Sequence, residues 1–200
     1  MQRSVLAKLA SVVADSCYLA GGVAVAAHLG HRRSRDLDLF SIADPTALLQ
    51  QLERVPGVTI DGRAPGTLHL RVDGIPVSLI EYRYPMLTSP SPVAELSVNV
   101  AAIEDLACMK LSAIAGRGAA RDFWDLHAMI CATGTSLAEV LIAFGRKYPV
   151  EDQGHVVRSL AYFGDADAAP LPDGLEVAAW QRIRADVEGW VRALVAAPPI

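Results

Sequence analysis

The sequence predicts an α+β protein in which a sheet-rich first half is followed by a helical second half. From Val58 to Tyr82 the chain alternates as a meander of strands, and Asp73-Gly74 is typical of a hairpin turn. Beyond Pro92 the apolar residues recur at helical spacing. Because residues 84–92 hold three prolines and two serines, we place a boundary there. We therefore expect two subdomains, residues 1–92 and 93–200.

Composition indicates a compact protein with a real core. The 200 residues are 52% hydrophobic, enough to bury a core of ordinary size. A formal net charge of -4 argues against binding nucleic acid through bulk charge, although basic residues cluster locally, as at 31–35. No stretch resembles a membrane span or signal peptide, so we expect a cytoplasmic protein. The three cysteines form no CxxC pair, which favours neither a disulfide framework nor a zinc site.

The first subdomain begins with an amphipathic helix over residues 5–13, followed by a short buried strand over 17–19. Gly21-Gly22 then lies where this strand passes into a helix over 23–29, and glycine there allows the backbone to approach another group closely. Asp44-Pro45 is typical of a helix N-cap, opening a helix that Pro56-Gly57 ends.

Asp36-Leu37-Asp38-Leu39-Phe40 alternates with the period of a strand, so both carboxylates point to one face. Two such carboxylates can share a magnesium ion, which proteins hold with one or two carboxylates plus substrate phosphates. The alternative is an edge strand with a solvated face.

The second subdomain reads as helices over 103–115, 119–131, 136–147 and 175–195. Lys110 sits on a largely apolar helix, where a lysine either extends to water or meets an anion. Asp122 and Asp125 share a helix face, and Arg121 can pair with Asp125 at the i,i+4 spacing.

These motifs together resemble the AbiEii/AbiGii-type nucleotidyltransferases, toxins of type IV toxin-antitoxin and abortive-infection systems that include the MenT group. The match covers most of the chain in four separated motifs. The matching residues are Gly21-Gly22, Arg33-Ser34-Arg35-Asp36-Leu37-Asp38-Leu39, Lys110 with Arg117, and Arg121-Asp122-Phe123-Trp124-Asp125-Leu126.

The resemblance implies a polymerase-β-like nucleotidyltransferase core, a mixed sheet flanked by helices, and a helical subdomain that completes the active-site cleft. The implied reaction transfers NMP from an NTP to an acceptor such as a tRNA 3′ end, with Mg²⁺ and a possible cognate antitoxin. The implied catalytic residues are Asp36, Lys110 and Asp125. The implied metal ligands are Asp36 and Asp38, and the implied nucleotide-binding residues are Gly21, Gly22, Ser34, Arg117 and Arg121.

The chain departs from the wider superfamily in two places. Gly22 stands where a serine is usual, and the third carboxylate expected on a later strand has no clear counterpart. Glu81 is the only candidate, but its alternation groups it with Val77 and Leu79 rather than with Ser78. Two other functions stay open, a kinase-like phosphotransferase and a catalytically silent binding protein of the same fold.

Overall fold

The computed structural model describes residues 1–93 and 96–196, and the chain divides into two compact units. Unit 1 is Met1–Ala102 and unit 2 is Ile103–Ile200. The division falls after Ala102 rather than after Pro92, because the strand Asn99–Val100 pairs with the first strand of the unit 1 sheet. The proline-rich stretch is therefore part of unit 1.

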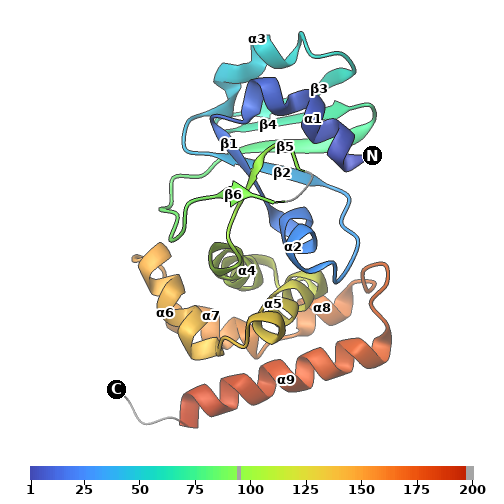
Figure 1. Cartoon of the computed structure of the whole chain (residues 1–200). Helices are drawn as coiled ribbons and strands as arrows, with labels where there is room; N and C mark the ends of the chain where they lie inside the picture. The colour runs from blue at the N-terminus through green and yellow to red at the C-terminus, as the bar shows by residue number, and fades with distance from the viewer. Residues whose placement is uncertain (94–95, 197–200) are drawn as a thin grey trace. The chain divides into compact units, whose positions relative to one another are not determined.

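Unit 1 is built on one seven-stranded mixed sheet (Figure 1), in the order β3-β4-β5-β2-β1-β7-β6. β2 is parallel to β5 and β1 is parallel to β7, while the other neighbours are antiparallel. In chain order the elements are α1 (Gln2–Val13), β1 (Cys17–Ala20), α2 (Gly21–Leu29), β2 (Leu37–Ser41), η1 (Pro45–Leu48), α3 (Leu49–Leu52), β3 (Val58–Ala64), β4 (Thr67–Val72), β5 (Ile75–Glu81), β6 (Ser91–Pro92) and β7 (Asn99–Val100).

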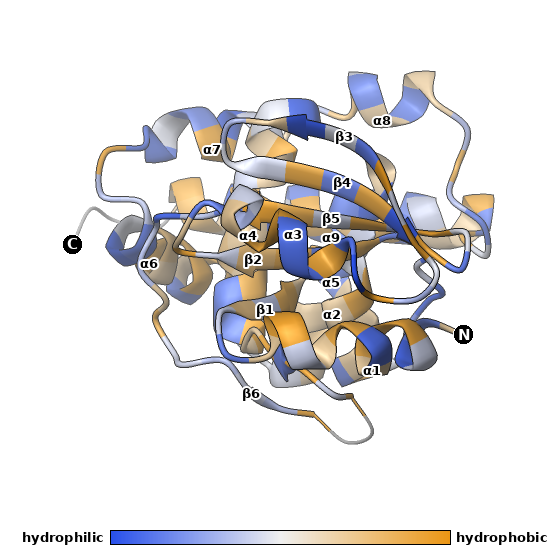
Figure 2. Cartoon of the chain, turned by 90° about the horizontal axis from the view of Figure 1, so that it is seen from above, coloured by the Kyte–Doolittle hydropathy of each residue, from blue (hydrophilic) through white to orange (hydrophobic). Residues whose placement is uncertain are grey.

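At β2 and β5 one face of the sheet is buried and the other is only partly buried. Leu37 and Leu39 of β2 lie opposite Val77 and Leu79 of β5, and all four are buried. The residues between them, such as Asp38, are half-buried. Figure 2 shows hydrophobic residues concentrated on β1, β2 and β5, whereas the edge strand β3 is more hydrophilic. The alternation read from the sequence therefore assigned both faces correctly.

Several element limits differ from the sequence-based expectation. α2 begins at Gly21 rather than Val23, because a left-handed backbone at Gly21 turns the chain directly out of β1. β2 begins at Leu37, so Asp36 lies just before the strand. The expected helix after Asp44 is a 3-10 turn followed by one short α-helical turn, and the Asp44 side chain accepts a hydrogen bond from the Thr46 amide, as an N-cap should.

Unit 2 is helical, with α4 (Ile103–Arg117), α5 (Ala120–Thr133), α6 (Leu137–Lys147), α7 (Gln153–Leu160), α8 (Gly164–Ala168) and α9 (Val177–Ala196). Its core includes an aromatic cluster of Phe123, Phe163 and Trp180, whose ring centroids are 5.0 to 5.9 Å apart. Ser136 and Glu139 form a capping box that starts α6. The short helices α7 and α8 were not expected, since segments of eight and five residues give little periodic signal.

Within the described ranges, no single helix has the length and hydropathy needed to cross a membrane, and α5 with α6 meet that test only as a pair bent by 113°.

Candidate active site

The turn from β1 into α2 is pressed against Asp38. Asp38 lies opposite Ala20 in the β1–β2 register, and Gly21 follows with φ +67°. A Cβ added at Gly21 would overlap Oδ2 of Asp38. Glycine is needed here for two reasons, because the left-handed backbone disfavours a side chain and because the carboxylate occupies the space of one.

Gly22 lies beside a hydroxyl and a guanidinium supplied by the loop after α2. A Cβ built on Gly22 would come 2.8 Å from Oγ of Ser34 and would also overlap the guanidinium of Arg32. The turn has glycine where a serine is usual, and the Ser34 hydroxyl lies close to the position that such a serine side chain would occupy. The turn thus combines the N-terminus of a nine-residue helix, a hydroxyl and a cation, all of which favour phosphate.

Gln2 holds this loop in place, although nothing in the sequence marked it. Its side-chain amide donates to the carbonyl of Ser34 at 2.7 Å and to that of Arg35 at 2.9 Å. The two bonds tie the first residue of α1 to the segment that leads into Asp36. A contact between residues more than thirty positions apart leaves no periodic signal in the sequence.

Asp36 and Asp38 fit a divalent metal by their chemistry. Asp36 is exposed and lies just before β2, whereas Asp38 is half-buried and lies within it. Carboxylate oxygens are the ligands that Mg²⁺ prefers. No group of three metal-binding side chains converges among the described residues, so substrate phosphates would have to complete the coordination.

The strand next to β2 supplies a hydroxyl rather than a third carboxylate. Ser78 of β5 lies opposite Asp38, and its Oγ is 3.1 Å from Nδ1 of His69. Glu81 lies opposite Ser41 and binds Arg83 with an N–O distance of 2.6 Å. The alternation that separated Glu81 from Ser78 in the sequence describes the sheet correctly.

Unit 2 contains a buried charge cluster on α4 and α5. Nζ of Lys110 is 2.9 Å from Oδ1 of Asp122 and 2.7 Å from Oδ2 of Asp125, and both carboxylates are fully buried. Arg117 adds two hydrogen bonds to Asp122, at 2.7 and 2.8 Å. Burial by itself would raise the pKa of Asp122, but the bonds from Arg117 and the charge of Lys110 outweigh it and hold that pKa below its ordinary value.

The expected pairing of Arg121 with Asp125 is replaced by the contact with Lys110. Arg121 is exposed, whereas Asp125 is buried and faces α4. The two residues share a helix face by spacing, but the packing of α4 on α5 gives Asp125 a nearer cation. Lys110 therefore does not extend to water but pairs with two anions, the carboxylates of Asp122 and Asp125.

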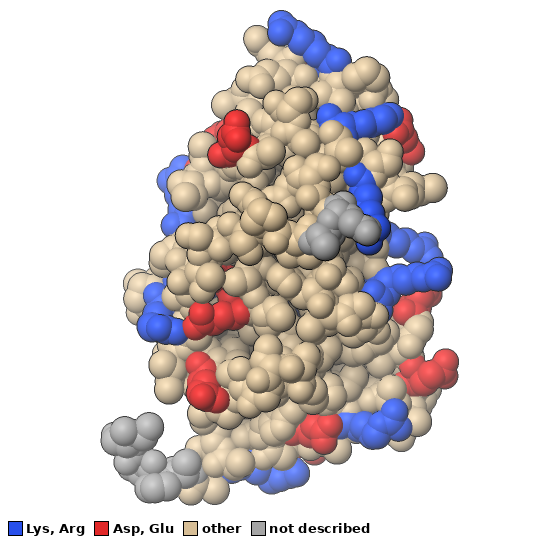
Figure 3. All heavy atoms as spheres, viewed as in Figure 1, with Lys and Arg blue, Asp and Glu red and all other residues tan. Residues whose placement is uncertain are grey.

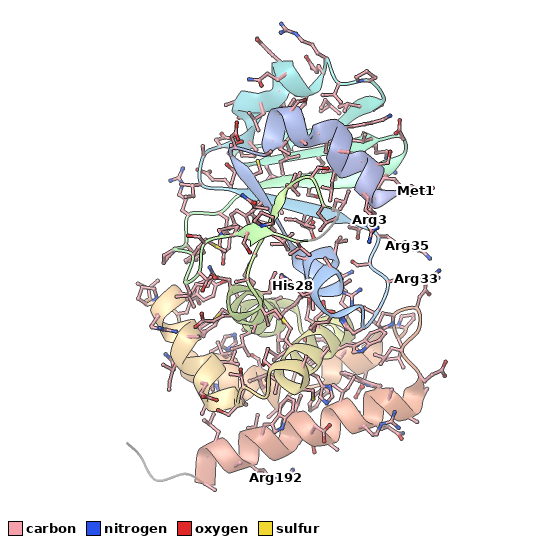
Figure 4. The ribbon with its side chains drawn as sticks, in the orientation of Figure 1. Met1, Arg3, His28, Arg33, Arg35 and Arg192 are labelled. Atoms are coloured by element: carbon pink, nitrogen blue, oxygen red, sulfur yellow. The ribbon has the colours of Figure 1, made fainter. Side chains whose placement is uncertain are left out.

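Unit 1 carries a basic surface beside its carboxylates. Figure 3 shows Lys and Arg side chains gathered along the edge of unit 1 where α1 begins, and Figure 4 places Arg3, Arg33 and Arg35 there. Arg33 and Arg35 belong to the loop that Gln2 holds, immediately before Asp36. A local basic surface therefore exists despite the net negative charge.

Replacing Gly21 with alanine should test the close approach to Asp38. We expect the variant to lose about 1–2 kcal/mol of unfolding free energy from the left-handed backbone and to lose enzymatic activity, because the new methyl group displaces the Asp38 carboxylate. Urea unfolding and a nucleotidyl-transfer assay would measure the two effects. Gly30→Ala is the matched control, since Gly30 has φ +62° but nothing within 4 Å of its added Cβ. Equal activity in both variants would contradict the prediction.

Comparisons with known proteins give the family. The model of "Nucleotidyl transferase AbiEii toxin, Type IV TA system" matches residues 54–199, which lie after the Asp36–Asp38 pair. An uncharacterized protein of Aquifex aeolicus (strain VF5) is 37% identical over 170 residues, covering 82% of this chain and 82% of its own length.

Two solved structures share the fold. The MenT4 nucleotidyltransferase toxin of Mycobacterium tuberculosis H37Rv matches with a TM-score of 0.65 and 19% identity, over 98% of this chain and 82% of its own. ANT(2'')-Ia in complex with adenylyl-2''-tobramycin matches with a TM-score of 0.58 and 12% identity, over 74% of this chain and 97% of its own. The predicted nucleotidyltransferase fold is thereby confirmed, and, by the family model and the Aquifex relative, the chain belongs to the AbiEii nucleotidyltransferase toxin family of type IV toxin-antitoxin systems.

Proposed function

We propose that this nucleotidyltransferase uses Mg²⁺ to transfer NMP from an NTP to a tRNA 3′ end. Membership of the family supplies the reaction class. The observation that carries the proposal is the Gly21-Gly22 turn, which lies against Asp38 on one side and against the Ser34 hydroxyl on the other. The proposed phosphate site and the proposed metal-binding carboxylates would therefore adjoin within unit 1.

The triphosphate would bind at the start of α2. The amides of the first helical turn point at an anion placed there, and the helix dipole favours negative charge. The Ser34 hydroxyl would donate to a phosphate oxygen, and the Arg32 guanidinium would neutralise part of its charge. Gln2 would serve this site indirectly by fixing the loop that carries Ser34.

Asp36 and Asp38 would hold the metal. When bound by these carboxylates, Mg²⁺ would supply positive charge for the phosphates and for the leaving pyrophosphate. The exposed Asp36 and the half-buried Asp38 would supply the carboxylate oxygens that this ion prefers as ligands. The absence of a side chain at Gly21 would leave the Asp38 carboxylate the space that it occupies.

We also assign Lys110 and Asp125 of unit 2 to the reaction. An ammonium group has three N–H donors, and two of those on Lys110 reach Asp122 and Asp125. The third donor is the one that we assign to the triphosphate, with Asp125 holding the amine for that purpose. Arg117 and the exposed Arg121 would add positive charge for the nucleotide.

The basic surface of Arg3, Arg33 and Arg35 supports tRNA as the proposed acceptor. A tRNA backbone lying on these side chains would release counterions, so transfer should weaken as salt rises. A tRNA acceptor would place the reaction in the cytoplasm, where a cognate antitoxin would be needed to restrain it.

The decisive experiment uses labelled nucleotides. The protein is incubated with total tRNA, Mg²⁺ and each of the four NTPs, labelled at the α-phosphate in one series and at the γ-phosphate in the other. We expect label on tRNA from an α-labelled NTP and none from the γ-labelled one, because only nucleotidyl transfer moves the α-phosphate. Label from the γ-position would show a phosphotransferase instead. No label on tRNA with any NTP would overturn the tRNA proposal.

A further inference from the structure

Asp38, a serine and a histidine lie opposite one another on three neighbouring strands of the sheet. Ser78 of β5 is opposite Asp38 of β2, and His69 of β4 is opposite Ser78. Directly opposed residues of neighbouring strands project to the same face, and the hydrogen bond of 3.1 Å between Ser78 Oγ and His69 Nδ1 joins the last two. The three side chains thus lie side by side on the partly open face of the sheet.

Transfer to a hydroxyl releases a proton, and the structure offers few groups to accept it near Asp38. Asp36 and Asp38 are assigned to the metal, and a metal-bound carboxylate is a poor base. Histidine is the side chain that most often serves as a general base in enzymes. His69 is exposed, so it can pass a proton on to water.

The charged groups around His69 already have partners of their own. Arg71 of β4 binds Asp61 of β3 with an N–O distance of 2.9 Å. Glu81 of β5 binds Arg83, and Asp44, which caps η1, accepts from the Thr46 amide. Among the described residues of β4 and of the elements packed against it, His69 is therefore the group best suited to exchange a proton with Ser78.

We propose that Ser78 and His69 relay the proton from the attacking hydroxyl, an inference that rests on the proposed function. The acceptor oxygen bonds to the α-phosphorus as the bond from that phosphorus to the pyrophosphate oxygen breaks. The acceptor proton passes to Ser78 Oγ while the Ser78 proton passes to Nδ1 of His69. The resulting imidazolium releases a proton to water, and the pyrophosphate leaves with the bonding electron pair.

The rate of transfer against pH tests this relay. For the wild type, kcat/KM should rise with pH as the base loses its proton and then level off. In His69→Ala and in Ser78→Ala, this rise should disappear and kcat/KM at neutral pH should fall by about a hundredfold. Ser78→Thr keeps a hydroxyl, so it should retain the rise and the wild-type kcat/KM. His155→Ala is the control, because His155 lies in unit 2 and bonds the carbonyl of Ala115. An unchanged rise in His69→Ala would overturn the relay.

A second measurement does not depend on activity. Imidazole ¹⁵N spectra report which ring nitrogen carries the proton, and in neutral His69 we expect Nδ1 to be unprotonated and to change its shift in Ser78→Ala. A protonated Nδ1 would overturn the relay, because Ser78 would then be the acceptor. A wild-type protein that transfers no NMP to any acceptor would overturn the proposed function and the relay together, whereas an active wild type with normal pH dependence in His69→Ala overturns the relay alone.

Discussion

Replacing Asp36 with asparagine should abolish NMP transfer while leaving the fold intact. The side chain is exposed and lies just before β2, so its loss should change the free energy of unfolding by no more than about 0.5 kcal/mol. Asparagine keeps the shape but removes the charge that would hold the metal. A loss of about 4 kcal/mol of transition-state stabilisation corresponds to roughly a thousandfold lower rate, measured as α-label on tRNA.

Asp15→Asn is the control for this variant. Asp15 is also exposed and lies in unit 1, so the substitution makes the same change of charge away from the carboxylate pair. It should retain full activity. A wild-type transfer rate in Asp36→Asn would contradict the metal role of Asp36. So would a loss of unfolding free energy large enough to explain the loss of activity by unfolding alone.

Among the single substitutions that we consider, Lys147→Met should lower the free energy of unfolding the most. Nζ of Lys147 is 2.7 Å from Oδ1 of Asp105, and both side chains are 0% exposed. The pair joins the last turn of α6 to the first turn of α4. Removing the cation takes its charge away from a fully buried carboxylate, and breaking a buried ion pair in this way costs about 3–5 kcal/mol. Urea unfolding of the full chain would measure the loss.

The neighbouring pair gives a matched control. Arg146 binds Glu104 at the same distance of 2.7 Å and joins the same two helices, but its side chain is 61% exposed and that of Glu104 is 42% exposed. Arg146→Met should therefore cost less than about 1 kcal/mol. Changing Asp105 to leucine together with Lys147→Met should recover much of the loss. Equal effects of Lys147→Met and Arg146→Met would contradict the role of burial.

Much of the architecture could be predicted because its signals are local. The alternation from Val58 to Tyr82 gave the strands β3 to β5, and helical spacing gave α4, α5, α6 and α9. The polar and apolar faces of β2 followed from the period of two. Element limits were less certain, since the left-handed Gly21 lets α2 begin without any intervening turn.

The contacts that organise the candidate site were not predictable in the same way. Gln2 reaches Ser34 and Arg35 across more than thirty residues, and Ser78 meets His69 only because two strands pair in one register. The sequence predicted that Lys110 either extends to water or meets an anion. Which of the two, and which anions, depended on how α4 packs on α5. Such contacts depend on register and packing, which periodicity does not encode.

By itself, the sequence determined the class of fold and the motifs that resemble the AbiEii family, because each depends on residue type and short spacing, and it predicted Asp36 and Asp38 as metal ligands on the same basis. The tertiary structure decided that the Ser34 hydroxyl occupies the space beside Gly22. It also decided that Ser78, rather than Glu81, stands opposite Asp38. The physical reason is that strand register and loop closure bring together residues that are distant along the chain, whereas local patterns specify only the element in which each residue lies.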